Sequence, residues 1–221
     1  MSKYKLINYN ELNKSEELDE FLIMECLNVA NNAHFPTDYL DVKEHLFGNP
    51  NLIKLFAVDM EERKIKAFLA ADYFTGYNGN NILHCHGIIV DPEIQSLGFS
   101  KLLVNKLVSE YNPDIVTAKT HNPRCFNAFA NIDNVISYYP NSFDEIPNPI
   151  YEVVKTDPYI CDVNENLIYV NAYPDEKISQ DYRDQSIKKI FDRLSPNDAQ
   201  AIVVVLNDQK LINGNKQFIK K

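Results

Sequence analysis

The segment Ile82–Ser100 has the sequence ILHCHGIIVDPEIQSLGFS and combines a strand, a loop and the start of a helix. Its first half, Ile82–Val90, is mostly apolar and is typical of a strand that Pro92 ends. We expect the following helix to begin at Gly98, where the missing Cβ atom lets a ligand approach the backbone closely. A helix N-terminus carries about half a positive charge and N–H groups without intrahelical acceptors. The segment therefore predicts an anion-binding turn between a strand and a helix.

The chain before this segment combines helix and strand patterns. Apolar residues recur at helical spacing in the first part and alternate in the second. The expected elements are a strand at Lys5–Tyr9, a helix of about four turns that starts at the capping pattern of Asn13 and Glu16, a helix at Tyr39–Leu46 after a polar break with Pro36, and an antiparallel hairpin of Leu52–Asp59 and Ile65–Phe74.

The chain after this segment continues the same mixture. Ala201–Leu206, AIVVVL, is continuously apolar and is predicted to be a strand buried on both faces. The other expected elements are helices at Gly98–Tyr111, Pro123–Ile132 and Asp181–Leu194, strands at Ile115–Lys119, Val135–Tyr139 and Leu167–Ala172, a loop at Asn141–Pro149 and a polar tail at Lys210–Lys221. Together these elements predict an α/β (α+β) fold with a mixed, mostly antiparallel sheet flanked by helices.

Two motifs resemble the GNAT superfamily of acetyl-CoA-dependent N-acetyltransferases. The run Val90-Asp91-Pro92 followed by Gln95-Ser96-Leu97-Gly98-Phe99-Ser100 resembles the family's phosphate-binding motif, although the family prefers Gly or Ala where Ser100 stands. Thr120-His121-Asn122-Pro123-Arg124, at a strand-to-helix junction, looks like the next motif. The resemblance implies a GNAT-like core over residues 1–140. Residues 141–221 would then be a C-terminal segment that completes or extends the same domain.

The resemblance also implies a binding mode for acetyl-CoA as cosubstrate, with no metal. In GNAT proteins the fourth and fifth strands diverge, and the pantetheine arm lies in the gap and pairs with the fourth strand. The matching positions here are Ile88, Ile89 and Val90 for pantetheine, the amides of Gln95, Ser96, Leu97, Gly98, Phe99 and Ser100 for the pyrophosphate, Lys101 for added positive charge, and Asn122 for a further cofactor contact.

Direct transfer to an amine needs a base, because an amine attacks only when it is neutral. Some family members have a catalytic Glu eleven residues before the phosphate motif, and His84 occupies that position here. His86 lies on the same strand face and is the second candidate. The open alternative is that both histidines lie on a polar strand face and have no catalytic role.

A general acid is harder to identify. Many family members have a Tyr in the helix after the fifth strand, but the matching position here is Phe129. Tyr138 and Tyr139 follow nearby and are either substitutes or ordinary strand aromatics. Water is a further option for protonating the leaving thiolate.

Composition excludes several classes of protein. The chain has 221 residues, of which 45% are hydrophobic and 24% charged, as expected for a globular protein. Its net charge of −9 argues against nonspecific nucleic-acid binding. The stretch Ser100–Cys125 carries +2 and the remainder −11, so an anionic ligand is expected near that stretch and a cationic acceptor elsewhere.

The N-terminal residues and the histidines bear on cellular location and metal binding. The first residues, MSKYKLINYN, lack the apolar core of a signal peptide, so we expect a cytoplasmic protein without membrane partners. His84-Cys85-His86 places two potential ligands on one strand face, but no third ligand is evident. Four separated cysteines are expected to be reduced thiols: Cys26, Cys85, Cys125 and Cys161.

The sequence thus predicts an N-acetyltransferase that acts on a primary amine of a small molecule or peptide. A non-catalytic acyl-CoA-binding module on the same fold is the alternative, motivated by Phe129 and by the lack of recognisable motifs after residue 140. A different nucleotide-binding α/β protein is less favoured, because the chain lacks GxxxxGK[ST] and GxGxxG. The acceptor is not identified, and a homodimer is left open.

Overall fold

The computed structural model describes residues 3–33, 35, 37–141, 146–160, 162–172, 185–209 and 211. Several expectations lie outside these residues: Pro36 in the polar break, Cys161, residues 142–145 of the expected loop, the start of the helix expected from Asp181, and nearly all of the tail from Lys210. In the described part of the chain, no helix combines the length and apolarity needed to cross a membrane.

The chain divides into two compact units. Unit 1 comprises Met1–Asp72 and Cys85–Leu107, and unit 2 comprises Tyr73–His84 and Val108–Lys221. Strands β3 (Lys64–Thr75) and β4 (Asn81–Val90) and helix α3 (Phe99–Tyr111) each contribute residues to both units. The expected division into residues 1–140 and 141–221 stays a prediction.

Unit 1 contains an antiparallel meander. Strand β1 (Tyr4–Asn8) pairs with β2 (Ile53–Asp59), and β2 pairs with β3, both antiparallel, while β4 follows β3 in the strand order. The β2–β3 hairpin places Lys54 opposite Ala70. The expected strands and hairpin of this part of the chain are confirmed to within one residue at each end.

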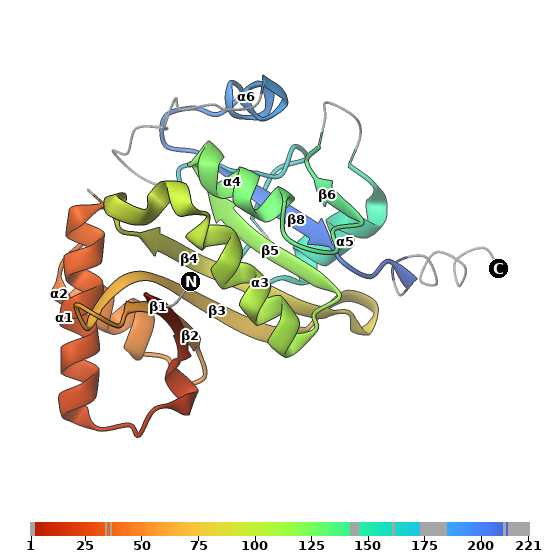
Figure 1. Ribbon diagram of the computed structural model, residues 1–221. Coiled ribbons are helices and arrows are strands. Elements are labelled where there is room, and N and C mark those ends of the chain that lie inside the picture. The colour runs from red at the N-terminus through yellow and green to blue at the C-terminus, as the bar shows by residue number, and fades with distance from the viewer. Residues whose placement is uncertain are drawn as a thin grey trace. The chain divides into compact units, whose positions relative to one another are not determined.

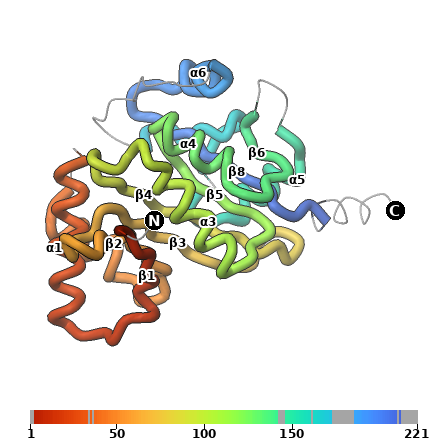
Figure 2. Tube along the Cα trace, in the orientation of Figure 1, coloured from red at the N-terminus to blue at the C-terminus, as the bar shows by residue number. Residues whose placement is uncertain are grey.

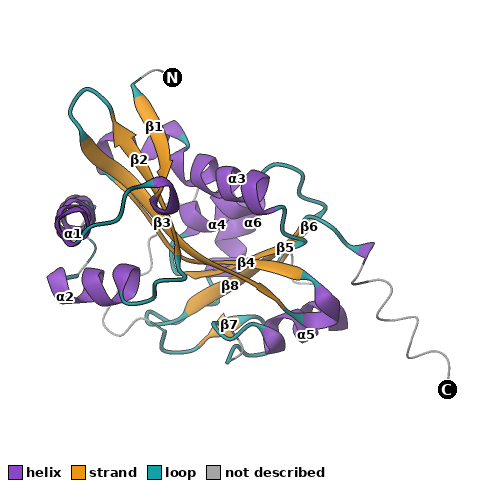
Figure 3. Ribbon diagram, turned by 90° about the horizontal axis from the view of Figure 1, so that it is seen from below, coloured by secondary structure: helices purple, strands orange, loops and turns teal. Residues whose placement is uncertain are grey.

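Helices cover both faces of the unit 1 strands (Figure 3). Helix α1 (Glu16–Asn32) and the short α2 (Tyr39–Val42) lie on one face, and α3 lies on the other. On the α1 face the core combines side chains of α1, β2 and β3, including Ile23, Phe56 and Phe68.

Two helix expectations in unit 1 were wrong in detail. The N-cap of α1 is Ser15, whose side chain accepts from the Leu18 N–H, and not Asn13. The second expected helix is α2 followed by a π-helical turn, η2 (Lys43–Phe47), so its hydrogen bonds change partway along. A short 3₁₀ turn, η1 (Tyr9–Glu11), follows β1.

In unit 2, strand β8 (Ala199–Val205) lies between β5 (Ile115–Thr120) and β6 (Ser137–Tyr139), as Figure 1 shows. It pairs antiparallel with both and with the short β7 (Ile168–Tyr169). All seven residues of β8 are buried, which confirms the expectation from the AIVVVL run.

Helices also pack on both faces of the unit 2 strands. Helix α4 (Pro123–Ala130) contacts α6 (Gln185–Phe191) through the rings of Phe126 and Phe191, whose centroids are 5.6 Å apart. Helix α5 (Asn148–Thr156) packs on a separate core that includes Ile115 and Val203. The loop expected at Asn141–Pro149 was wrong at its end, because Pro149 lies in the first turn of α5, where a missing N–H costs nothing.

Candidate functional site

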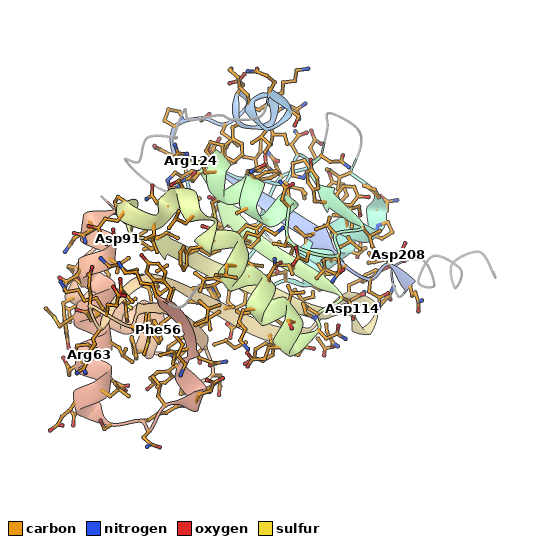
Figure 4. All side chains as sticks on the ribbon, in the orientation of Figure 1. Phe56, Arg63, Asp91, Asp114, Arg124 and Asp208 are labelled. Atoms are coloured by element: carbon orange, nitrogen blue, oxygen red, sulfur yellow. The ribbon has the colours of Figure 1, made fainter. Side chains whose placement is uncertain are left out.

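The turn after β4 is built around Asp91 (Figure 4). Its carboxylate accepts from the Glu93 N–H at 3.0 Å and from the Asn32 side chain at 3.1 Å. This caps the 3₁₀ segment η4 (Pro92–Leu97), and Asn32 ties the cap to the end of α1. Asp91 therefore fixes where the chain leaves the strand.

The chain then enters α3 through Gly98, a path that Figure 2 follows. Gly98 adopts a left-handed conformation with φ of 79°, which glycine adopts without strain. The first intrahelical bond of α3 runs from the Leu102 N–H to the Gly98 carbonyl at 3.0 Å, so the N–H groups of residues 99–101 lie ahead of it. Residues 95–98 are exposed. An exposed turn thus leads into a helix N-terminus, the kind of site where a phosphate oxygen binds, although Phe99 itself is buried.

Lys66 supports the same turn from β3. Its ammonium contacts the Glu93 carboxylate at 2.8 Å and that of Glu62 at 3.1 Å, and its side chain is 9% exposed. Bonding to Glu93 raises the pKa of Lys66, against the opposing effect of burial. The Lys66 carbonyl accepts from the Asp91 N–H at 2.8 Å. The exposed Gln95 also turns back and donates to the Val90 carbonyl at 3.1 Å.

His86 lies in the unit 1 part of β4 and contacts a carboxylate. Its Nε2 is 3.0 Å from the Oδ2 of Asp72 on β3. The two side chains are 30% and 14% exposed. Since a carboxylate only accepts, Nε2 carries a hydrogen and donates it. The pair is therefore a polar contact that solvent reaches.

His84 lies in the unit 2 part of β4 and is sealed. Its Nδ1 is 2.9 Å from the Thr117 hydroxyl oxygen and 3.3 Å from the Oδ2 of Asp157. Thr117 donates to Asp157 at 2.5 Å, so its oxygen accepts from Nδ1 and that nitrogen holds a proton. The Tyr159 ring stacks on the imidazole with centroids 4.6 Å apart. The His84 and Asp157 side chains are 1% and 0% exposed.

Burial and hydrogen bonding act in opposite directions on Asp157. Burial alone would raise the pKa of its carboxyl, but bonds from His84, Thr117 and the Tyr159 backbone together hold this pKa below its ordinary value. The carboxylate is thus ionised inside unit 2, where three donors take the place of water.

Comparison with solved structures adds a fold assignment. The chain matches the ribosomal-protein-S18-alanine N-acetyltransferase from Escherichia coli with a TM-score of 0.53 and 12% identity, over 92% of this chain and 94% of that one. This chain has the GNAT fold. The mixed, mostly antiparallel sheet flanked by helices that we expected is confirmed with it.

Other matches are weaker. A GNAT family acetyltransferase from Staphylococcus aureus subsp. aureus USA300_TCH1516 has a TM-score of 0.37 and 14% identity, over 47% of this chain and 76% of that one. A ribosomal-protein-alanine N-acetyltransferase from Brucella melitensis biovar Abortus 2308 has a TM-score of 0.38 and 14% identity, over 49% and 72%. Both scores are below 0.5, so the assignment of the GNAT fold rests on the Escherichia coli structure. No protein-family model and no curated protein matches the sequence.

The residues expected to bind the cosubstrate of a GNAT enzyme fall in both units. Ile88, Ile89 and Val90 form the end of β4 in unit 1, and Ile89 packs against the α1-side core. Gln95–Lys101 are in unit 1 as well. Asn122 is in unit 2, where its side-chain oxygen accepts from the N–H groups of Arg124 and Cys125 and caps α4. Their contacts with a cosubstrate stay predictions.

The aromatic residue at the family's general-acid position, Phe129, and the two possible substitutes, Tyr138 and Tyr139, lie in unit 2. Phe129, on α4, is 1% exposed and belongs to the core. Tyr138 is in β6 and packs edge-on against the Phe126 ring, with centroids 6.2 Å apart, and Tyr139 packs against the α5 core. Among the described residues, no group of three or more His, Cys, Asp and Glu side chains is placed to hold a metal ion.

The sequence reasoning missed Asp72, Asp157 and Lys66. Asp72, Asp157 and Lys66 contact His86, His84 and Glu93, each on another element of the chain, although Lys66 also contacts the nearby Glu62. Asp72 and Lys66 both occur within Ile65–Phe74, an otherwise mostly apolar strand, and a charged residue inside such a strand was the signal available to find them.

Proposed function

We propose that this protein transfers the acetyl group of acetyl-CoA to a primary amine by direct attack. The observation that supports this most is the exposed turn at Gly98, which presents backbone donors at the start of α3 in a GNAT fold. The Escherichia coli protein of similar fold is an N-acetyltransferase by name. At 12% identity that likeness concerns the fold, so the activity of this chain is our proposal.

In this proposal the backbone N–H groups of Gln95, Ser96, Leu97, Gly98, Phe99 and Ser100 bind the pyrophosphate. Ile88, Ile89 and Val90 offer backbone groups to the pantetheine arm, and Lys101 adds positive charge. Asn122 uses its oxygen to cap α4, so a cofactor contact from this residue would use its amide hydrogens. When bound, acetyl-CoA supplies an acetyl group activated as a thioester.

We assign the general base to His86 in preference to His84. His86 is partly exposed, whereas His84 is enclosed by Thr117, Asp157 and Tyr159. In the step, the amine nitrogen forms the new C–N bond and loses a proton to the His86 imidazole. The C–S bond breaks and its electron pair stays on sulfur. His84 then has a structural role in unit 2.

The departing sulfur needs a proton or has to leave as a thiolate. Phe129 has no hydroxyl to supply one. Water is the donor that requires nothing further from the chain, and Tyr138 and Tyr139 are the alternative donors.

A non-catalytic acyl-CoA-binding module is the second candidate. The buried Phe129, at the position where the family often has a Tyr, is the observation that favours it. Such a module would use the same Gly98 turn and would leave the thioester intact.

Acceptor and partners are proposals of the same kind. The acidic balance outside Ser100–Cys125 favours a cationic small molecule or peptide over nucleic acid or membrane. We also propose a cytoplasmic location. Whether the chain forms a homodimer is a question for a measurement of its mass in solution.

Calorimetry with CoA and acetyl-CoA tests the binding step, and release of free thiol against a panel of amines tests the transfer. Ser96→Glu places a negative charge in the exposed turn and should abolish binding, while Ser109→Glu at an exposed position of α3 should not. If calorimetry detects no heat of binding at millimolar CoA, both candidate functions are contradicted. Binding without turnover of any amine favours the module.

A further inference from the structure

The outer side of helix α1 carries two large apolar side chains where a surface helix normally carries polar ones. Phe21 is 51% exposed and Met24 is 48% exposed. They are three residues apart, so they are neighbours on the helix surface, and Glu17 and Glu20 lie one turn before them on the same side. The opposite side of α1 supplies the buried residues Leu22, Ile23, Cys26, Val29 and Ala30. Helix α1 therefore has a second, solvent-facing apolar surface.

Helix α2 extends this surface. It lies beside α1 (Figures 1 and 3), and its Tyr39 hydroxyl donates to the Glu20 carboxylate at 2.5 Å. The next residue, Leu40, is 61% exposed. Single apolar side chains are common on protein surfaces, but several on adjoining elements mark an interaction site. Five residues define the α1–α2 face: Glu17, Glu20, Phe21, Met24 and Leu40.

The same part of the chain is strongly acidic. Residues 16–47 contain eight acidic residues against one lysine and no arginine, so they carry −7 of the net charge of −9. The lysine, Lys43, contacts Glu20 at 3.5 Å. The exposed carboxylates of this stretch are Glu16, Glu17, Glu20, Asp38, Asp41 and Glu44. Such a charge repels nucleic-acid phosphates and anionic lipids and attracts cations.

We propose that the α1–α2 face binds a basic peptide segment of a partner protein. Apolar side chains of the segment pack on Phe21, Met24 and Leu40, and its lysine or arginine side chains meet the surrounding carboxylates. Burial of the apolar groups gives affinity, whereas the opposite charges speed the encounter and select the partner. The segment need not be the acceptor of the proposed acetyl transfer, so this inference stands apart from that function.

A basic protein segment suits this face better than other occupants. A second copy of this chain would present the same acidic surface in a symmetric contact, which opposes pairing. A small cation would gain nothing from the three apolar side chains. A basic segment with apolar residues satisfies both features at once. The chain has one such stretch in its own sequence, residues 210–221, KLINGNKQFIKK, which the experiment has to distinguish from a partner.

The probe is a synthetic peptide of Leu and Lys at helical spacing, labelled with fluorescein, and its anisotropy is measured with the full chain. We expect binding that weakens about tenfold between low and physiological ionic strength, because exposed charges are screened by salt. The same peptide with Glu in place of Lys should not bind. Failure of the Lys peptide to bind at any ionic strength overturns the proposal.

The apolar part of the face is tested by substitution. Phe21→Ala combined with Met24→Ala should weaken binding about tenfold or more, because the anchoring side chains are lost. The matched control is Met60→Ala, which removes a methionine of the same 48% exposure in the turn between β2 and β3. It should bind the probe as the wild type does. Equal weakening by both variants overturns the proposal.

The acidic part is tested in the same way. Glu16→Gln combined with Glu17→Gln should weaken binding about threefold at low salt and flatten its salt dependence. The control, Glu61→Gln with Glu165→Gln, removes two exposed carboxylates outside residues 16–47 and should leave binding unchanged. If the two pairs of substitutions act alike, net charge attracts the probe and the face does not, which overturns the proposal.

Two further outcomes would assign the face to another occupant and overturn the proposal. The first is that the full chain binds the probe only after Lys216→Glu, Lys220→Glu and Lys221→Glu, which would identify residues 210–221 as the occupant. The second is that the mass in solution shows a dimer that Phe21→Ala with Met24→Ala abolishes, which would identify a second copy.

Discussion

His84 and His86 are two residues apart on β4, and each contacts an aspartate, yet the two pairs have different surroundings. In unit 2, His84 and Asp157 are shut off from solvent and share a Thr117 hydroxyl. In unit 1, His86 and Asp72 contact each other at a place that solvent reaches. The same two residue types thus form a sealed pair and an open pair. Burial, rather than residue type, therefore distinguishes the two pairs.

The largest expected effect is a difference in unfolding free energy between variants of the His84–Asp157 pair and of the His86–Asp72 pair. Asp157→Ala should lower the free energy of unfolding by about 3–5 kcal/mol, because it leaves buried donors without their acceptor. Asp72→Ala should lower it by about 1 kcal/mol or less, since water reaches that pair. Urea unfolding followed by circular dichroism measures both. Equal losses would contradict the distinction between a sealed and an open pair.

Lowering the pH should remove part of the stabilisation that the Asp157 carboxylate provides. The pKa of Asp157 is lowered in the fold, so its contribution is complete above the unfolded value of about 4 and is lost as pH falls through the folded pKa. Asp157→Asn has no such group, so its unfolding free energy should fall less steeply below about pH 4. Urea midpoints from pH 6 downward, taken on both proteins, measure the difference. Parallel curves would show that Asp157 is not the group responsible.

Lys66 extends the comparison to its ion pair with Glu93, which supports the turn that leads to Gly98. Lys66→Met keeps most of the side-chain volume but removes the bond to Glu93, so the turn loses a support. CoA affinity should fall about tenfold, equivalent to about 1.4 kcal/mol, in calorimetry. Lys66→Arg should bind nearly as the wild type does.

The matched control for Lys66 is Lys43→Met, which removes an exposed pair with Glu20 in the same unit. We expect no change in CoA affinity from it. If both methionine variants weaken binding alike, net charge rather than the turn is responsible.

The smallest effect concerns the backbone of the turn. Gly98→Ala should cost about 1 kcal/mol of unfolding free energy, because alanine is strained at a φ of 79°. Gly87→Ala is the control, since Gly87 does not have that conformation and both glycines have open space for a Cβ atom. Thermal unfolding measures the pair. A neutral Gly98→Ala would mean that the turn relaxes and is not held by Asp91.

Local pattern predicted most of the strands and the Gly98 turn, because both depend on near neighbours in sequence. It failed at α5, where two prolines indicated a loop although Pro149 is compatible with a first helical turn. It also placed His84 and His86 on one strand face without separating them. That separation depends on Asp157 and Tyr159, more than seventy residues later, and no local pattern reports it.

The pairing of β5 with β8 has a consequence for synthesis of the chain. Residues 115–120 leave the ribosome about eighty residues before 199–205, the strand that covers their edge. Until then that edge of the nascent chain has unsatisfied backbone groups and can pair with another chain. Premature termination before β8 should therefore yield aggregates rather than a smaller folded protein, and slow translation of the last quarter prolongs the exposure.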